Sequence, residues 1–315
     1  MKALIFDSSL RLTSQPEPQP GKGDVLIKIH YSSICNTDLE IIKGYMGFQG
    51  IPGHEFVGEV VNKESRFFGR RVVGEINCSC GKCLMCRTKR SSHCMNRSVL
   101  GIAGRPGVFA EYTVLPESNL HLVPESVPDT EAVFTEPLAA ALEILEQVPV
   151  DPKTSVFILG AGKLGLLIAQ VFKAKGLIYV LFDPHEEKVK KARSMDLLAM
   201  QLTSMKKGAK AEICIDCTGH PKGIIAALDH VYPRGKVILK TTVAKPSKID
   251  LNQLVINEIE LLGSRCGPFV PALEMLEKKE VKTAPMITEV VDFNNILKGF
   301  AIAKKKGTIK VLIRH

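Results

Sequence analysis

The rhythm of hydrophobic and polar positions changes along this chain near Ser155. Before residue 115, short apolar stretches such as Val25–His30 and Phe56–Val61 are separated by segments rich in glycine and proline. This is the pattern of β-strands joined by turns. A longer apolar stretch around Leu138–Leu145 has helical spacing. The first part of the chain therefore predicts a β-rich domain that ends before a helix.

From Ser155 onward, apolar strands alternate with amphipathic helices. The strand Ser155–Leu159 is followed by a helix at Lys163–Lys175, which Gly176 ends. Later strands are expected at Ile178–Phe182, Ile213–Asp216, Val237–Lys240 and Ile259–Leu262, with helices at Glu186–Met195 and Gly223–Val231. Strict alternation of this kind predicts a parallel sheet built from βαβ units. Beyond Pro268 we expect a helix at Pro271–Glu280 and short strands that include Ile309–Ile313.

The composition narrows the class of protein. A chain of 315 residues is long enough for two domains, and 45% hydrophobic and 24% charged residues are ordinary for a globular protein. The N-terminal apolar run is too short for a secretory signal, and no apolar stretch approaches the roughly 18 residues of a membrane span. We therefore expect a cytoplasmic protein with no membrane partner. The net charge is +9, but the lysines are scattered and no stretch interleaves basic and aromatic residues, so we expect no nucleic-acid partner.

A glycine-rich turn follows the strand at Ser155–Leu159. Gly160, Gly162 and Gly165 fit the pattern G-x-G-x-x-G, with Lys163 and Leu164 opening the next helix. In this context the first glycine makes a tight turn, the second lets the backbone approach a pyrophosphate, and the third allows close packing of helix on strand. Asp183 ends the next strand, where a carboxylate accepts hydrogen bonds from the ribose hydroxyls of NAD and repels the 2′-phosphate of NADP. The sequence therefore predicts an NAD site.

Nine cysteines are present, and five of them lie within residues 78–94. Cys80, Cys83, Cys86 and Cys94 have the spacing C-x2-C-x2-C-x7-C. Four sulfurs suit a tetrahedral zinc ion and leave no open position for a substrate, so we expect a structural zinc. The spacing departs from that of a bacterial ferredoxin cluster. Cys78 remains as a spare thiol.

A second set of possible metal ligands is dispersed through the chain. Cys35 stands in CNTD, His54 and Glu55 follow Gly53, and Glu136 stands in TEPLAA. A cysteine, a histidine and a carboxylate leave a fourth position open, which is the arrangement of a catalytic zinc. These residues predict a second zinc, which acts on an oxygen of the substrate.

These motifs together resemble the zinc-containing medium-chain dehydrogenase/reductase family of the alcohol dehydrogenase superfamily. The matching features span most of the chain: Cys35-x-Thr37-Asp38, Gly53-His54-Glu55, the cysteine run, Gly107-x-Phe109-Ala110-Glu111-Tyr112, Glu136-Pro137 and Gly160–Gly165. In having a glutamate at position 136, the chain resembles the sorbitol, threonine and glucose dehydrogenase branch of the family. The resemblance implies a GroES-like catalytic domain from residues 1–124 and 268–315, and a Rossmann domain with a doubly wound parallel sheet at residues 125–267.

The resemblance also implies roles for individual residues. Cys35 and His54 would be catalytic zinc ligands, either Glu55 or Glu136 would complete the set, and exchange between the two glutamates is open. Asp38 would orient His54. Lys188 would contact the adenosine ribose. Thr37 would hydrogen-bond the substrate oxygen and pass its proton outward.

One position departs from the family pattern. Many members have a histidine five residues after the first ligand cysteine, and Glu40 stands there in this chain. The proton therefore leaves through water or through Glu40.

The implied function is hydride transfer between NAD(H) and a secondary alcohol, polyol, sugar or ketone. The alternatives are an aldehyde or ketone reductase that acts on simple alcohols, and a non-catalytic zinc-ribbon binding protein. Because family members pair through an edge strand of the nucleotide domain, Glu258–Ser264 is expected to help form a homodimer or homotetramer.

Overall fold

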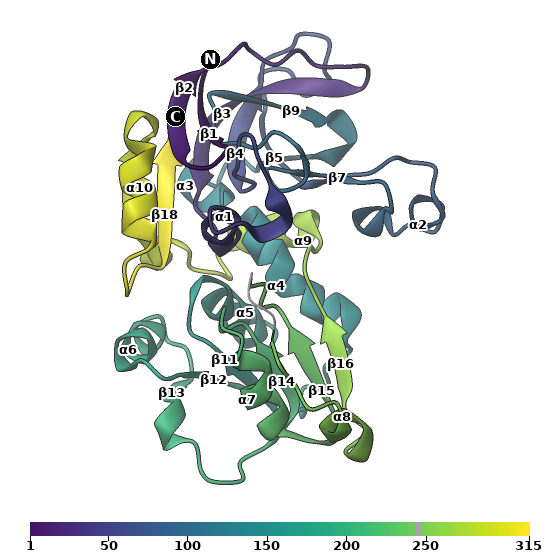
Figure 1. Ribbon diagram of the computed structural model, residues 1–315, viewed down its shortest axis with the longest axis vertical. Helices are drawn as coiled ribbons and strands as arrows, with labels where there is room; N and C mark the ends of the chain where they lie inside the picture. Colours follow the sequence, from purple (N-terminus) through teal and green to yellow (C-terminus); the bar gives the residue numbers. More distant parts are fainter. Residues whose placement is uncertain (244–246) are drawn as a thin grey trace. The chain divides into compact units, whose positions relative to one another are not determined.

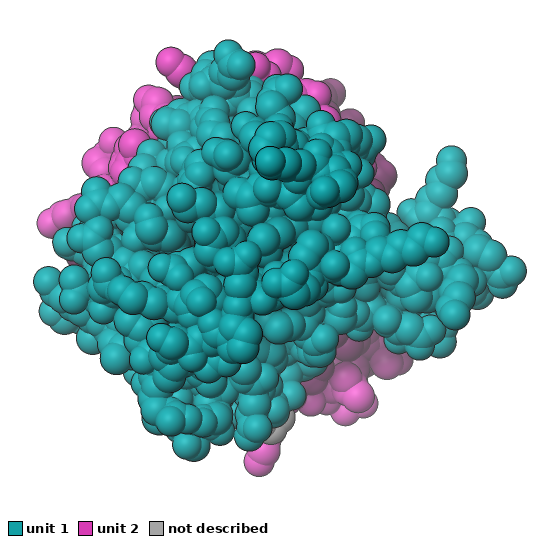
Figure 2. Space-filling model, turned by 90° about the horizontal axis from the view of Figure 1, so that it is seen from above, with its two compact units in different colours: residues 1–136, 286–315 teal, residues 137–285 magenta. Residues whose placement is uncertain are grey.

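The computed structural model describes residues 1–243 and 247–315, which form two compact units. The first unit comprises Met1–Glu136 and Met286–His315, and the second comprises Pro137–Pro285. Figure 2 colours the two units separately. The chain crosses between them later than the boundaries expected at 124/125 and 267/268.

Contacts near each boundary account for its position. Helix α3 (Asp129–Ala132) belongs to the first unit, where Asp129 binds His30 and Arg71 at 2.9 and 2.8 Å. Beyond helix α9, the backbone N–H of Lys282 donates to the side chain of Gln170 in the second unit at 2.7 Å.

A seven-stranded sheet forms the centre of the first unit. Its order is β10-β5-β4-β3-β18-β17, and β9 also pairs with β3. The strands are β3 (Asp24–Ser33), β4 (Phe56–Val60), β5 (Arg71–Gly74), β9 (Tyr112–Pro116), β10 (Leu120–Leu122), β17 (Ile287–Asp292) and β18 (Lys310–Arg314). Neighbours run antiparallel except β17 and β18. Because Leu312 pairs with Ser33, segments from both ends of the sequence lie side by side in one sheet (Figure 1).

Smaller elements surround this sheet. Two further sheets are formed by β1 (Lys2–Phe6) with β2 (Leu10–Ser14), and by β6 (Asn77–Cys78), β7 (Ser98–Leu100) and β8 (Gly104–Arg105). The remaining helices of the unit are α1 (Asn36–Ile41), η1 (Tyr45–Gly47), α2 (Leu84–Arg87), η2 (Ser91–His93), η3 (Glu117–Asn119), η6 (Phe293–Asn295) and α10 (Ile296–Ala303). A buried cluster that includes Ile34, Phe109 and Phe300 joins the N-terminal segment to α10.

The second unit is built on a six-stranded parallel sheet with the order β13-β12-β11-β14-β15-β16. The strands are β11 (Val156–Leu159), β12 (Tyr179–Asp183), β13 (Ala199–Gln201), β14 (Ala211–Asp216), β15 (Val231–Leu239) and β16 (Glu260–Gly263). Counted along the chain the order is 3-2-1-4-5-6, that of a doubly wound dinucleotide-binding sheet, whose strand order reverses beside β11. The predicted α/β class is confirmed.

Helices connect these strands. They are α4 (Thr135–Gln147), which begins in the first unit, α5 (Lys163–Ala174), α6 (Glu186–Ser194), η4 (Leu202–Ser204), α7 (Gly223–Asp229), α8 (Asn252–Ile256), α9 (Phe269–Glu277) and η5 (Ala284–Met286). Within the described part of the chain, no helix combines the length and apolar character needed to cross a membrane.

Strand β15 begins six residues before the expected start at Val237. Its pairing with β14 shifts from Ala211–Val231 to Ile213–Lys236, so the residues between form an irregular segment in which Arg234 has a φ of +61°. Pro233 and Gly235 are residue types common in turns, but in the structure they lie in an irregular part of one strand.

Candidate functional site

The dispersed ligand set gathers where three neighbouring strands of the first unit meet. Cys35 follows β3, His54 and Glu55 precede β4, and Lys310 begins β18. Because the order of these strands is β4-β3-β18, the three segments are adjacent. The backbone N–H of Ser33 donates to the carbonyl of Glu55 at 3.0 Å, and that of Ile34 donates to Val311 at 3.0 Å. The sheet itself therefore assembles the site.

Cys35, His54 and Glu55 each offer one ligand atom within 4.8 Å of the others. Asp38 fixes two of them with a single carboxylate. Its Oδ2 accepts the backbone N–H of Cys35 at 2.8 Å, and its Oδ1 lies 3.3 Å from Nδ1 of His54 in a buried ion-pair contact. With Nδ1 facing Asp38, the other ring nitrogen of His54 is left for a metal, as in carboxylate–histidine–zinc arrangements.

Burial and charge act in opposite directions on His54. Burial disfavours the charged imidazole, but the carboxylate of Asp38 and the sulfur of Cys35 together hold the pKa of His54 well above its ordinary value. An anionic neighbour that stabilises a positive imidazole also stabilises one bound to a cation. The residues therefore fit a metal.

Two groups that the sequence motifs did not include donate hydrogen bonds to the side chain of Glu55. The hydroxyl of Ser33 and the ammonium of Lys310 both donate to Oε2 of Glu55. Glu55 and Lys310 are each only 1% exposed, so their ion pair is fully buried. The ammonium also lies 5.7 Å from the ring centroid of Phe134, a favourable cation–π distance.

The charges of this pair support one another. Burial would raise the pKa of Glu55, but the charge of Lys310, followed by that of His54 and the hydrogen bonds, brings it below the usual value. Burial would lower the pKa of Lys310, but Glu55 and Cys35, with a smaller contribution from Glu136, raise it. Both groups are therefore charged.

The remaining predicted residues lie around this group. Thr37 is in α1, with its hydroxyl oxygen 3.8 Å from the Cys35 sulfur. Glu136 is half-buried in the first turn of α4. Its charge acts on Lys310, but among the described residues the ligand group contains Glu55 rather than Glu136. Glu40 is largely buried and pairs with the ammonium of Lys43 at 2.7 Å.

Close packing of glycines fixes the segment that carries His54. Gly53 has a φ of +97°, and a Cβ there would lie 2.8 Å from the ring of Phe109. A Cβ at Gly107 would lie 2.3 Å from the carbonyl oxygen of Gly53. The motif around Gly107 therefore serves the geometry of the ligand segment, because any side chain at either position would displace it.

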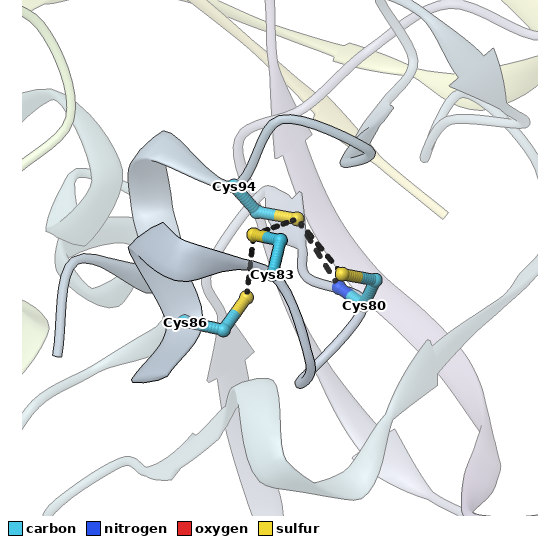
Figure 3. A group of neighbouring side chains, drawn as sticks. All are labelled: Cys80, Cys83, Cys86 and Cys94. Atoms are coloured by element: carbon cyan, nitrogen blue, oxygen red, sulfur yellow. Dashed lines mark hydrogen bonds between the residues drawn. The ribbon is translucent and has the colours of Figure 1, made fainter. Parts of the chain in front are cut away.

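The four-cysteine cluster lies on a loop that carries α2 and projects from the strands of the first unit (Figures 1 and 3). Sulfur–sulfur distances are 3.5 Å from Cys83 to Cys86, 3.7 Å from Cys83 to Cys94 and 3.5 Å from Cys94 to Cys80. Four sulfurs bound to one zinc at about 2.3 Å lie about 3.8 Å apart. The spacing fits a tetrahedral metal, and the cysteines are free thiols.

Backbone N–H groups point at these sulfurs. Those of Cys80 and Asn96 donate to the Cys94 sulfur at 3.3 and 3.4 Å. Backbone N–H groups of Cys86 and Met95 lower the pKa of Cys83 to about 6. Burial and hydrogen bonds with the adjacent sulfurs raise the pKa of Cys86 to about 11, because the Cys86 thiol keeps its proton as a donor. A metal ion bound to all four sulfurs would displace that proton.

Cys78 stands apart from the cluster. It is buried in β6, where the side-chain amide of Asn119 contacts its sulfur at 3.8 Å. Burial raises its pKa. The thiol packs as a small apolar side chain.

In the second unit, the glycine-rich turn follows β11 and opens α5. Gly160 has a φ of +107°, and a Cβ on Gly165 would lie 1.8 Å from the carbonyl oxygen of Gly160. A Cβ on Gly162 would meet nothing within 4 Å. Two glycines are thus required by the turn and by helix packing, whereas the space beside Gly162 is open to a ligand. Lys163 and Leu164 lie in the first turn of α5.

Asp183 ends β12 and is almost fully buried. Its Oδ2 accepts the backbone N–H of Ala161 at 2.8 Å, and its Oδ1 accepts that of His185 at 2.9 Å. The ammonium of Lys188 lies 3.6 Å from Oδ2. The carboxylate therefore also holds the glycine-rich turn against the end of β12.

A polar network at the end of β14 was missed by the sequence analysis. One oxygen of Asp216 accepts the backbone N–H and hydroxyl of Thr218, at 3.0 and 2.8 Å, and the hydroxyl of Thr241 at 3.0 Å. The adjacent backbone carbonyl of Cys217 lies 2.8 Å from where a Cβ on Gly160 would be. The network therefore supports the glycine-rich turn. Its only sequence signal was an aspartate at the end of a strand.

Two family models match the chain, one within each compact unit. Residues 21–125 match the model of the alcohol dehydrogenase GroES-like domain. Residues 164–278 match the model of the zinc-binding dehydrogenases.

Individual relatives agree with these matches over nearly the full length. L-threonine 3-dehydrogenase of Pyrococcus horikoshii is 35% identical over 322 aligned positions, covering 94% of this chain and 92% of the relative. Sorbitol dehydrogenase of Halalkalibacterium halodurans is 28% identical, covering 99% of each. The crystal structure of Escherichia coli RspB complexed with NADH superposes with a TM-score of 0.90, at 26% identity, covering 100% of this chain and 99% of that one.

Fold, site and relatives define a zinc-type oxidoreductase that uses a nicotinamide cofactor. The chain belongs to the zinc-containing medium-chain dehydrogenase/reductase family. The resemblance inferred from the motifs is confirmed, and the relatives do not favour a non-catalytic zinc-ribbon protein.

Proposed function

We propose that this protein transfers hydride between NAD(H) and a secondary alcohol, polyol or sugar, or the corresponding ketone, at a zinc ion held by Cys35, His54 and a glutamate. The observation that carries the proposal is the convergence of Cys35, His54 and Glu55 within 4.8 Å, next to the Thr37 hydroxyl. A second, structural zinc would be held by the four-cysteine cluster.

Two relatives support a hydroxyl-bearing substrate. Sorbitol is a polyol, and threonine carries a secondary hydroxyl at the carbon that the relative's name specifies. The glutamate at 136 favours the same branch. Family likeness defines chemistry better than substrate, so a panel of compounds is needed.

The chain's own residues would prepare the substrate for reaction. When bound, zinc supplies a Lewis acid that lowers the pKa of a hydroxyl, and NAD supplies the hydride acceptor. Asp38 keeps His54 oriented through Nδ1. Thr37 accepts the substrate proton and passes it on. Glu40 lies three residues further along α1, on the same helix face, and is our candidate to receive that proton, with water as the alternative.

The preference for NAD over NADP would come from Asp183. Its position at the end of β12 is that of the residue that receives the ribose hydroxyls in this sheet topology. A second negative charge, on a 2′-phosphate, would be repelled there. Lys188, 3.6 Å from the carboxylate, is proposed to contact the same ribose.

The partner of the chain is proposed to be a second copy of itself. Strand β16 is the edge of the six-stranded sheet, and its Leu261 is exposed. Leu251, Val255 and Ile256, in and beside α8, also expose large apolar side chains. An exposed apolar edge strand favours pairing about a twofold axis, which would join two sheets into one.

The test follows the formation or loss of NADH by its absorbance. Zinc-loaded protein is incubated with NAD⁺ or NADP⁺ and polyols, sugars, hydroxy amino acids or simple alcohols, and in reverse with ketones and aldehydes. We expect oxidation of a secondary alcohol or polyol, with NAD⁺ preferred. Thr37→Val should lower kcat/KM by about 100-fold or more, because a proton-transfer group is lost. The matched control Thr13→Val, on β2, should not.

Inactivity on the whole panel together with only one tightly held zinc per chain would contradict the proposal. A reductase that acts only on simple aldehydes or ketones would show activity in the reverse arm alone.

A further inference from the structure

The charge of Lys310 is used by none of the steps proposed above. Lys310 is buried at the start of β18, 255 positions along the chain from the glutamate that it contacts. A charged lysine in a core is costly unless it is paired. Lys310 meets this condition through Glu55, a member of the ligand group.

The contacts of Lys310 are directed at one atom. Both Lys310 and Ser33 donate to Oε2 of Glu55, and neither engages Oε1. Backbone pairing of β18 with β3 fixes Ser33 opposite Leu312, so both donors approach from the same side of the sheet junction. Glu55 is thus held by one oxygen while it lies in the ligand group.

The count of charges explains why a cation belongs here. A zinc ion is balanced by the Cys35 thiolate and one carboxylate. Besides Asp38, which lies against His54, the site contains two carboxylates, Glu55 and Glu136, and the charge of Glu136 also acts on Lys310. With Lys310 included, the group carries about one surplus negative charge. Without Lys310, a buried site would carry two, and the attraction of zinc for both glutamates would not be opposed by the ammonium.

We propose that Lys310 is a positioning residue that competes with the catalytic zinc for Glu55 and so keeps one coordination position open for the substrate. The inference rests on the proposed function, because it requires a metal at Cys35 and His54. Glu136 is then the alternative ligand while Lys310 holds Glu55, and Glu55, which lies in the ligand group, binds when that contact loosens. In the structure Glu55 is engaged with Lys310.

The experiment compares the full-length protein with Lys310→Met, Lys310→Arg and a control, Lys173→Met, which removes an exposed ion pair with Asp196 in the second unit. Metal content is measured first. The catalytic metal is then replaced by Co²⁺, and its visible absorption and the rate of zinc release to a chelator are recorded.

In Lys310→Met we expect zinc release to slow about tenfold, because Glu55 closes the fourth position. The cobalt bands should shift accordingly, and kcat/KM should fall. Lys310→Arg should restore all three, and Lys173→Met should leave them unchanged. Ser33→Ala, which removes the second donor to Oε2 of Glu55, should shift the cobalt bands in the same direction by a smaller amount. If Lys310→Met fails to fold, Ser33→Ala becomes the test of whether donors to Glu55 control its access to the metal.

The outcomes separate the two proposals. Two metal ions per chain with cobalt bands and zinc release unchanged in folded Lys310→Met, or with faster release, would overturn the role of Lys310 alone. If Lys310→Met does not fold, unchanged cobalt bands in Ser33→Ala would do the same. A wild-type protein that binds only one metal ion per chain would overturn the proposed function, and this inference with it.

Discussion

His315 places an imidazole in the interior of the first unit. Its ring stacks on Phe293 with centroids 4.3 Å apart, and Nε2 lies 2.8 Å from the hydroxyl of Ser32. Burial disfavours the charged form and lowers the pKa of His315 to about 3. The folded protein therefore keeps this side chain neutral across the range in which an exposed histidine titrates.

We predict an acid-sensitive contribution to stability from this residue. Above the ordinary value of 6.5 the imidazole is neutral in both states. As the pH falls from 6.5 toward 3, the unfolded chain takes up a proton that the folded chain does not, so the free energy of unfolding falls by about 1.4 kcal/mol per pH unit. His315→Gln should remove this part of the pH dependence in denaturant titrations. Ser32→Ala, which keeps the imidazole buried, should retain it, and an equal pH dependence in wild type and His315→Gln would contradict the assignment.

Some site residues could be predicted from the sequence and others could not. Cys80 to Cys94 were predicted as a group because local spacing brings their sulfurs onto one point, and the distances fit a metal. Lys310 was not predicted, because it follows a run of solvent-exposed lysines and its partner is 255 positions away. Whether a lysine is a surface charge or a buried counter-ion depends on strand pairing, which local pattern does not encode.

At the scale of elements, the turn between β11 and α5 contains glycines that are needed for two different reasons. Gly165 allows α5 to pack on the turn, because a Cβ there would overlap the carbonyl of Gly160. Gly162 adopts an extended backbone with a φ of −89° that any residue can adopt, and its surroundings are open. Gly165 is required by the fold, and we propose that Gly162 leaves room for the cofactor.

The two alanine variants should therefore behave differently. Gly165→Ala should destabilise the second unit by about 1–3 kcal/mol or more, because α5 must move away from the turn. Gly162→Ala should unfold like the wild type but bind NADH at least about tenfold more weakly, a loss of about 1.4 kcal/mol. Thermal unfolding and NADH fluorescence titration measure both. Wild-type NADH affinity in Gly162→Ala would show that the cofactor does not approach this backbone.

The observed boundaries agree with the predicted ones where the spacing of hydrophobic residues is regular along the whole element. Helix α5 and strand β11 lie within a residue or so of their expected limits. Strand β15 does not, because its early part pairs with β14 across the irregular segment that contains Pro233. Hydrogen bonding to β14 therefore extends β15 through residues that usually end a strand.

At the scale of the whole molecule, the six-stranded sheet has two edges with different surfaces. Leu261 on β16 is 36% exposed, and the helix before it exposes Val255 and Ile256. Leu198, beside the opposite edge strand β13, is 56% exposed. The two leucines provide a matched comparison of edges.

We predict that Leu261→Lys shifts the protein toward a monomer, because a charge would be buried where two β16 strands meet. Leu198→Lys should leave the assembly unchanged. Light scattering during size-exclusion chromatography gives the mass directly. A mass unaffected by Leu261→Lys would place the interface elsewhere, and a wild-type monomer would contradict the proposed homo-oligomer.

The sequence by itself determined the family, the parallel sheet, the glycine-rich turn and the four-cysteine cluster, because each follows from short local motifs and their order along the chain. The tertiary structure decided which dispersed residues meet. It grouped Glu55 with Cys35 and His54, let Asp38 hold both Cys35 and His54, and joined Lys310 to Glu55 across the sheet. The physical reason is that antiparallel pairing of β3 with β4 and β18 sets distances between residues that no local spacing relates.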